Sequence, residues 1–249
     1  MQNLIKLLLM TLFLSSCQAP DAKILVFGHR GARGHVAENT LASISKAMEL
    51  GVDGVEIDIF RCATGELVVF HDKTIDVLTN GTGYIVQMSL DSIKQFRVLG
   101  KEPIPTLTEV MDLIDGKIQL NIELKGSQTA VLTSELIEHY FKTSNWEAKN
   151  VFISSFDWNE LDQFYSVNKK VAIAVLTEDD PIDAIPVAKR LDAFAINPDF
   201  KSLTHVNVEK IHEAGFMVYP WTVNEPEDIE RMITMGVDAL ITDFPERIR

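Results

Sequence analysis

Carboxylate side chains interrupt two apolar stretches of this 249-residue sequence. Glu56 and Asp58 stand two positions apart within residues 55–60, and Glu123 stands within residues 118–124. Residues two apart on a strand point to the same face, and buried carboxylates need a counter-charge. Three carboxylates on neighbouring strands form the oxygen-rich set that Ca²⁺ or Mg²⁺ prefers. A solvated, exposed strand face is the alternative explanation of the same pattern.

Two histidines follow predicted strands in the same half of the chain. His29 and Arg30 come directly after the apolar run 24–27, and His71 precedes Asp72, whose carboxylate could orient the imidazole. A single histidine at a strand end is more often structural. Two of them beside an arginine and a carboxylate cluster favour general acid–base chemistry on a phosphate. No Cys/His cluster with zinc spacing accompanies them.

Short β-branched runs alternate with runs of helical period from residue 24 to the end of the chain. We expect barrel-type strands at 24–27, 55–60, 118–124, 151–154, 171–176, 193–196, 216–220 and 238–241. We expect helices at 40–50, 106–114, 128–142, 157–166, 180–190, 204–214 and 226–234, and an irregular segment at 72–104. Eight such units predict an α/β TIM (β/α)8 barrel, in which catalytic groups follow the strands. A doubly wound open sheet is the alternative.

The overall charge restricts the possible partners. The formal net charge is −13, from 23 Lys and Arg against 36 Asp and Glu. Such a balance repels polyanions and excludes nucleic acid as a partner. A small anionic substrate stays compatible with it, because a bound divalent cation reverses the local field.

The first 17 residues have the features of an export signal. A short cationic start ends at Lys6, residues 7–14 are almost wholly apolar, and Leu14-Ser15-Ser16-Cys17 follows. This run is too short to span a bilayer and resembles a bacterial lipobox, in which the cysteine becomes lipidated. We therefore expect residues 1–17 to be a lipoprotein signal peptide and residues 18–249 to be the mature domain. A plain signal peptide or a buried N-terminal helix is the alternative.

Two neighbouring observations extend this expectation. Gln18 after the predicted lipidated Cys17 does not resemble the aspartate that retains lipoproteins in the inner membrane. We therefore expect anchoring in the outer membrane, facing the periplasm. Cys62 then has no partner for an internal disulfide.

The order of short motifs along the chain resembles the glycerophosphodiester phosphodiesterase family. These motifs are GHRG (28–31), ENT (38–40), VEID (55–58), HD (71–72), TNGTG (79–83), IPTLTEV (104–110), NIELK (121–125), SSF (154–156), PWTVN (220–224) and GVDALITDFP (236–245). The resemblance covers essentially the whole predicted mature chain and implies a TIM barrel with a small insertion after strand two, at residues 72–104. Ala37 stands where the family usually has proline, and the chain ends soon after Pro245, which puts an eighth helix in doubt.

The resemblance also implies a role for each matching residue. It implies metal ligation by Glu56, Asp58 and Glu123, acid–base catalysis by His29 and His71, and substrate binding by Arg30, Lys125 and Trp221. From its position alone, Trp221 could equally be a barrel-core aromatic residue.

The implied reaction is metal-dependent hydrolysis of glycerophosphodiesters to an alcohol and glycerol 3-phosphate. The sequence leaves open the head group, the choice between Ca²⁺ and Mg²⁺, and the oligomeric state. One alternative is a lysophospholipase D that acts on membrane lysolipids. The other is a non-catalytic lipoprotein that binds a phosphorylated ligand.

Overall fold

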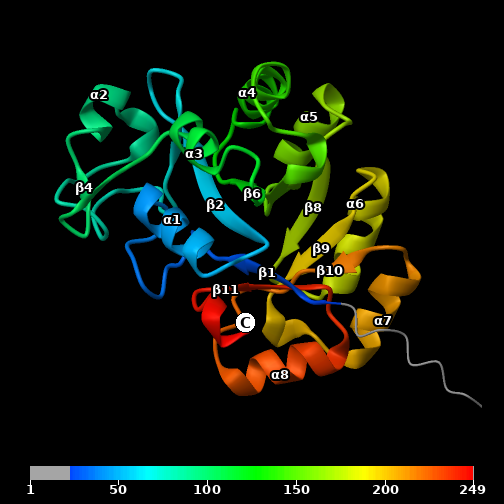
Figure 1. Ribbon diagram of the computed structural model, residues 1–249. Coiled ribbons are helices and arrows are strands. Elements are labelled where there is room, and N and C mark those ends of the chain that lie inside the picture. The colour runs from blue at the N-terminus through cyan, green and yellow to red at the C-terminus, as the bar shows by residue number, and fades with distance from the viewer. Residues whose placement is uncertain (1–22, 249) are drawn as a thin grey trace, which may run out of the picture.

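The computed structural model describes residues 23–248 of the chain. The predicted signal peptide and the predicted lipidation site, Cys17, lie outside these residues. Eight parallel strands form the centre of the molecule (Figure 1). They are β1 (Leu25–Gly28), β2 (Gly54–Arg61), β6 (Gln119–Leu124), β7 (Val151–Ser155), β8 (Ala172–Thr177), β9 (Ala195–Pro198), β10 (Met217–Val218) and β11 (Ala239–Thr242).

The sheet closes on itself. Its strands run in the order β10-β9-β8-β7-β6-β2-β1-β11. Backbone hydrogen bonds join the two ends, from the Asp238 amide to the Val218 carbonyl (3.1 Å) and from the Ile241 amide to the Pro220 carbonyl (3.0 Å). The predicted barrel is therefore confirmed, and the doubly wound open sheet is wrong.

Helices surround the barrel on its outer side (Figure 1). They are α1 (Leu41–Glu49), α3 (Leu107–Ile114), α4 (Ala130–Thr143), α5 (Trp158–Val167), α6 (Ile185–Arg190), α7 (His205–Glu213) and α8 (Pro226–Met235). After β11 the described chain forms only the 3-10 turn η5 (Pro245–Arg247), so the doubt about an eighth helix is confirmed for the residues up to 248. Within the described residues, no helix combines the length and the apolar character that crossing a membrane requires.

Aromatic rings fill the barrel interior toward the N-terminal ends of the strands. Phe27, Phe152 and Tyr219 are at most 4% exposed, and their ring centroids lie 5.6 to 6.1 Å apart. Phe27 precedes His29 by two positions, and Phe152 precedes Ser154 by two, so polar residues form the next layer toward the strand ends. The rings form the floor beneath that layer.

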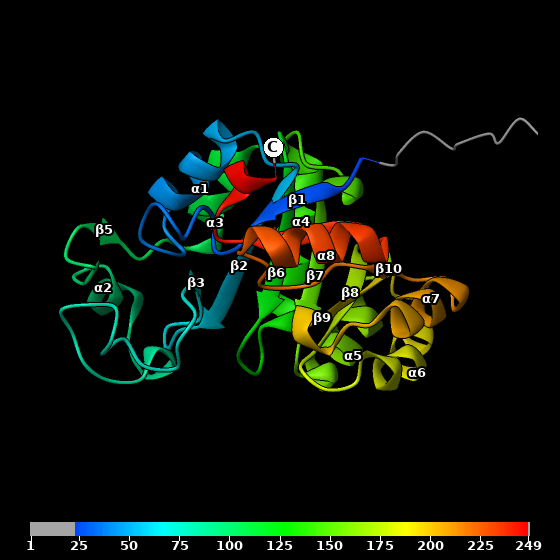
Figure 2. The same cartoon turned by 90° about the horizontal axis from the view of Figure 1, so that it is seen from below.

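The segment after β2 is more regular than the sequence suggested. Strand β3 (Leu67–Val69) lies where the sequence predicts a short extended piece at 67–70, and it pairs antiparallel with β2. Within residues 72–104 the chain forms η1 (Ile85–Gln87), α2 (Leu90–Ile93) and the hairpin of β4 (Arg97–Val98) and β5 (Glu102–Pro103). They surround a separate hydrophobic cluster that includes Phe70, Ile75 and Ile93. Figure 2 shows this insertion beside the barrel, on the side of β2 and β3. The expectation of an irregular segment was wrong here, because elements of two to four residues leave no detectable period.

Truncation of the aromatic floor should destabilise the barrel. The Phe27→Ala variant is expected to lose about 3–5 kcal/mol of unfolding free energy, because a fully buried ring leaves a cavity. Urea denaturation measures this loss. Val206→Ala, at a residue that is 61% exposed, is the control and should change the free energy by less than about 0.5 kcal/mol. Equal effects in the two variants would contradict the proposed floor.

Candidate active site

The register between β2 and β6 brings the three predicted carboxylates together. Asp58 pairs with Glu123 in this parallel ladder, and Glu56 pairs with Asn121. Glu56, Asp58 and Glu123 are each at most 8% exposed, and one oxygen of each lies within 4.8 Å of the others. The three carboxylates therefore form a buried cluster on β2 and β6, and the alternative of an exposed, solvated strand face is wrong.

The cluster carries charge that its own cations only partly offset. Burial and the neighbouring Asp58 raise the pKa of Glu56, and the same two causes raise the pKa of Glu123 to about 8. For Asp58, burial acts in the same direction, but Arg30 and then Lys125 outweigh it and lower the pKa. Among the described residues, Glu56 Oε1 is a buried oxygen without a hydrogen-bond donor. A buried carboxylate cluster with such an unpaired oxygen can hold a divalent cation.

Arg30 links the cluster to the loop after β1. Its backbone has a φ of 52°, a conformation that costs free energy for a non-glycine residue. This conformation points its amide at Glu56 Oε2 (2.9 Å). Its guanidinium donates to Glu38 Oε1 (2.6 Å) and lies 3.4 Å from Asp58 Oδ2. The next residue, Gly31, has a φ of 82°, and a Cβ there would lie 2.3 Å from Ser43 Oγ.

The motif Glu38-Asn39-Thr40 holds these groups in place. Glu38 forms ion pairs with two arginines, because Arg30 Nη1 lies 2.6 Å from its Oε1 and Arg33 Nε lies 2.6 Å from its Oε2. Asn39 donates to Asp58 Oδ2 (2.8 Å) and accepts from the Asp58 amide (3.2 Å). Thr40 caps the N-terminus of α1. The sequence predicts the N-cap of this helix at Asn39 or Thr40, and Thr40 is confirmed. The contacts of Glu38 and Asn39 with the site were not predicted, although three consecutive polar side chains that are all buried are unusual.

His29 is held by a carboxylate from the far end of the chain. Its Nδ1 lies 2.7 Å from Asp243 Oδ1, while Arg30 Nε donates to its Nε2 at 3.2 Å. Asn224 in turn donates to Asp243 Oδ2 (2.8 Å). Burial lowers the pKa of His29 more than the Asp243 hydrogen bond raises it. These contacts favour a neutral imidazole with its proton on Nδ1 and a lone pair on Nε2.

His71 has a corresponding partner but a more open position. Its Nδ1 lies 2.7 Å from Asp72 Oδ1, so the expected orientation by Asp72 is present. Its Nε2 lies 3.3 Å from Lys125 Nζ, which is also 2.9 Å from Glu123 Oε1. The His71 side chain is 29% exposed, whereas that of His29 is 10% exposed. One histidine is therefore enclosed, and the other faces the opening.

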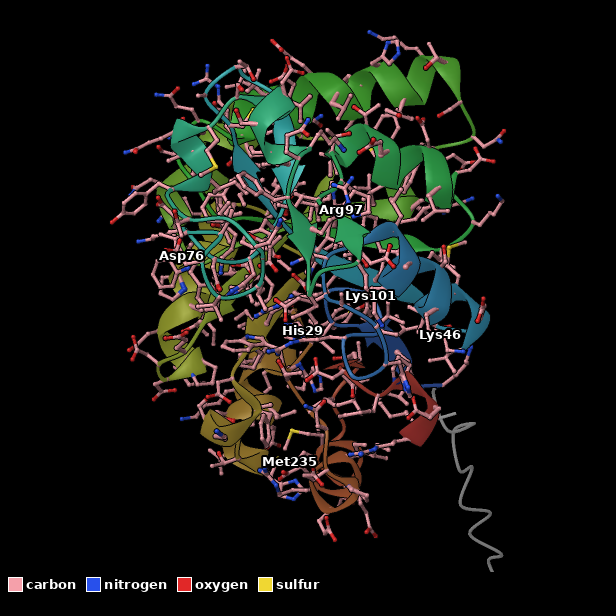
Figure 3. The ribbon with its side chains drawn as sticks, turned by 90° about the vertical axis from the view of Figure 1, so that its left-hand side faces the viewer. His29, Lys46, Asp76, Arg97, Lys101 and Met235 are labelled. Atoms are coloured by element: carbon pink, nitrogen blue, oxygen red, sulfur yellow. The ribbon has the colours of Figure 1, made fainter. Side chains whose placement is uncertain are left out.

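One cavity of about 230 Å³ is bordered by both histidines, by two of the three clustered carboxylates and by two cationic side chains: His29, His71, Glu56, Glu123, Arg30 and Lys125. Figure 3 shows His29, from the loop after β1, well inside the outline of the molecule. The predicted substrate-binding residue Trp221 lines the cavity, and its indole Nε1 donates to the Asn197 carbonyl (2.9 Å). Phe156 and Glu178 line it as well, and the sequence analysis did not single them out. Their positions after β7 and β8 are the signal that could have identified them.

The sequence as a whole matches a family of known activity. Residues 29–247 match the glycerophosphoryl diester phosphodiesterase family. The chain belongs to this family. A glycerophosphodiester phosphodiesterase from Caldanaerobacter subterraneus subsp. tengcongensis is 37% identical over 236 residues, which cover 91% of this chain and 96% of that protein.

Solved structures of the family share the fold. A phosphodiesterase from Oleispira antarctica, in complex with the product sn-glycerol-3-phosphate, has a TM-score of 0.81 and 29% identity and covers 90% of this chain and 94% of its own. A glycerophosphodiester phosphodiesterase from Parabacteroides distasonis has a TM-score of 0.76 and 27% identity, with 92% and 96% of the two chains covered.

A divalent cation should stabilise the protein more at pH 8 than at pH 6. The pKa of Glu123 is raised in the folded state from an ordinary value of 4.5 to about 8. Between these values the folded state keeps a proton that the unfolded state has lost, so metal-free stability falls as pH rises. A cation that binds the ionised cluster reverses this loss and binds more tightly as its ligands deprotonate.

Calorimetry with Ca²⁺ or Mg²⁺, and with a chelator, measures the gain in Tm at each pH. In the Glu123→Gln variant, the gain in Tm that the cation causes should no longer be larger at pH 8 than at pH 6. A gain that is absent, or is the same at both pH values in the wild-type protein, would contradict the cation site.

Proposed function

We propose that this protein hydrolyses glycerophosphodiesters to an alcohol and glycerol 3-phosphate, with a divalent cation and with His29 and His71 as the acid–base pair. The observation that carries the proposal is that one cavity holds a buried carboxylate cluster, two cationic side chains and two carboxylate-oriented histidines. The family membership and the glycerol 3-phosphate bound to the Oleispira antarctica protein support the choice of substrate.

Glu56, Asp58 and Glu123 would hold the cation, which is Ca²⁺ or Mg²⁺ on the chemistry of its oxygen ligands. When bound, such an ion polarises a phosphoryl oxygen and lowers the pKa of a bound hydroxyl or water. Glu56 Oε1, which lacks a donor among the described residues, fits this role.

Arg30 and Lys125 bind and orient the phosphate. Burial opposes the charge on each, but neighbouring carboxylates raise the pKa of both and keep them cationic. The planar guanidinium suits bidentate contact with two phosphate oxygens, whereas Lys125 acts as a point charge. Because Lys125 also lies beside His71, the phosphate is held next to the more exposed histidine.

His29 acts as the base. Its Nε2 accepts the proton of the nucleophile, and Asp243 stabilises the imidazolium that forms on the other side of the ring. The nucleophile is water, or it is the neighbouring glycerol hydroxyl, which expels the alcohol and gives a cyclic phosphate that a water molecule then opens to glycerol 3-phosphate. His71 faces the cavity opening and delivers a proton to the departing alkoxide.

For the cellular location we infer a lipid-anchored protein of the outer membrane, facing the periplasm. The inference rests on the lipobox-like residues 14–17 and on Gln18. Mass spectrometry of the N-terminal peptide from membrane fractions tests it, with Cys17→Ser as the unlipidated control.

Removal of the His71 imidazole should abolish most activity. The His71→Ala variant is expected to hydrolyse glycerophosphocholine about 10²–10⁴-fold more slowly, because the leaving alkoxide loses its proton donor. Release of glycerol 3-phosphate is the readout. His139→Ala, on the exposed face of α4, is the matched control and should keep wild-type activity. A rate near wild type for His71→Ala would remove this residue from the mechanism.

The Asp243→Asn variant should alter both the rate and its pH dependence. Loss of the carboxylate removes an interaction that raises the pKa of His29. Because the base must be deprotonated, the ascending limb of the plot of kcat/KM against pH should move to lower pH. The rate itself should fall about 10²-fold or more, because the imidazole loses its orienting partner.

The control is Asp238→Asn, which alters the 2.9 Å pair of Asp238 with His212 outside the cavity. Its pH profile should keep the wild-type limb. If Asp243→Asn also keeps that limb, His29 is not the base.

A further inference from the structure

Part of the cavity wall, here called the aromatic end, has no role in the proposed chemistry. Phe156, Glu178 and Trp221 line it, from the segments that follow β7, β8 and β10. The rings of Phe156 and Trp221 meet edge to face, with centroids 5.4 Å apart and planes at 84°. Phe156 is 37% exposed, so part of its surface stays available to a ligand.

Glu178 places a negative charge at this aromatic end. Its side chain is exposed, and it forms no hydrogen bond or ion pair with the other residues of 23–248. A carboxylate beside a phosphate pocket repels the substrate, unless the substrate also carries a positive charge beyond its phosphate. Glu178 therefore indicates a substrate whose head group, on the other side of the phosphate from glycerol, carries a positive charge.

Aromatic faces are suited to such a cation. An ammonium group gains electrostatic attraction from a ring within about 6 Å, and quaternary ammonium ions bind well because they need no hydrogen-bond acceptor. Lys125 Nζ lies 5.8 Å from the Phe156 centroid, so this ring is already within range of one cation on its phosphate-binding side.

We propose that Phe156, Trp221 and Glu178 form a subsite for a cationic head group, so that choline and ethanolamine diesters are favoured over diesters with neutral head groups. This inference rests on the proposed function, because the phosphate of the same substrate occupies the end with Arg30 and Lys125. The competing possibility is that the glycerol moiety, common to all substrates, occupies the aromatic end.

The two possibilities differ in their response to the charge at Glu178. The test compares kcat/KM for glycerophosphocholine with kcat/KM for glycerophosphoglycerol, whose head group is neutral, in the wild-type protein and in Glu178→Gln. We expect the choline-to-glycerol ratio to fall about three- to tenfold, the size expected of a partly exposed cation site. Phe156→Leu should lower the ratio in the same direction.

Glu213→Gln, on α7 outside the cavity, is the charge control and should keep the wild-type ratio. An unchanged ratio in Glu178→Gln, or an equal fall for both substrates, would overturn the head-group subsite and favour glycerol at the aromatic end.

Calorimetric binding of the same two diesters separates this inference from the proposed function. The titration uses His71→Ala and His71→Ala/Glu178→Gln, both loaded with cation. If the wild-type protein turns over neither diester, the proposed function fails. A three- to tenfold loss of choline preference in binding would still support the subsite, and an unchanged preference would overturn it.

Discussion

The burial of three carboxylates on two adjacent strands is the constraint on which the rest of the site depends. Glu56, Asp58 and Glu123 lie close together because the β2–β6 register places Asp58 opposite Glu123. Like charges at such a distance raise one another's pKa and cost stability unless cations offset them. The positive charges of Lys125, Arg30 and the proposed divalent cation all offset the repulsion among these carboxylates.

The loop after β1 shows how the chain meets that constraint. Arg30 adopts a left-handed backbone conformation, which costs about 1–3 kcal/mol for a non-glycine residue. In return its amide and guanidinium reach two members of the cluster at once. Asn39, also left-handed at a φ of 56°, donates to the same Asp58 oxygen and accepts from the Asp58 amide. The strained loop backbone therefore allows contacts that offset the repulsion among the three carboxylates.

Much of the barrel and of the cation site could be predicted from the sequence. The alternation of apolar runs placed all eight barrel strands to within a few residues, and a spacing of two placed Glu56 and Asp58 on one face. The pair of His29 with Asp243 could not be obtained in this way, because the two residues are 214 positions apart and meet only when β1 pairs with β11. The same limit applies to Phe156 and Glu178, because the loops after β7 and β8 decide that both line the cavity.

The aromatic floor has a kinetic consequence. Phe27, Phe152 and Tyr219 block the barrel below the polar layer, so the cavity is a dead-end chamber with its exit at the strand ends. Substrate, water and both products share that passage. An alcohol or glycerol 3-phosphate that lingers in the chamber excludes the next substrate molecule, so accumulated product should compete directly with substrate, and turnover depends on how quickly the chamber empties.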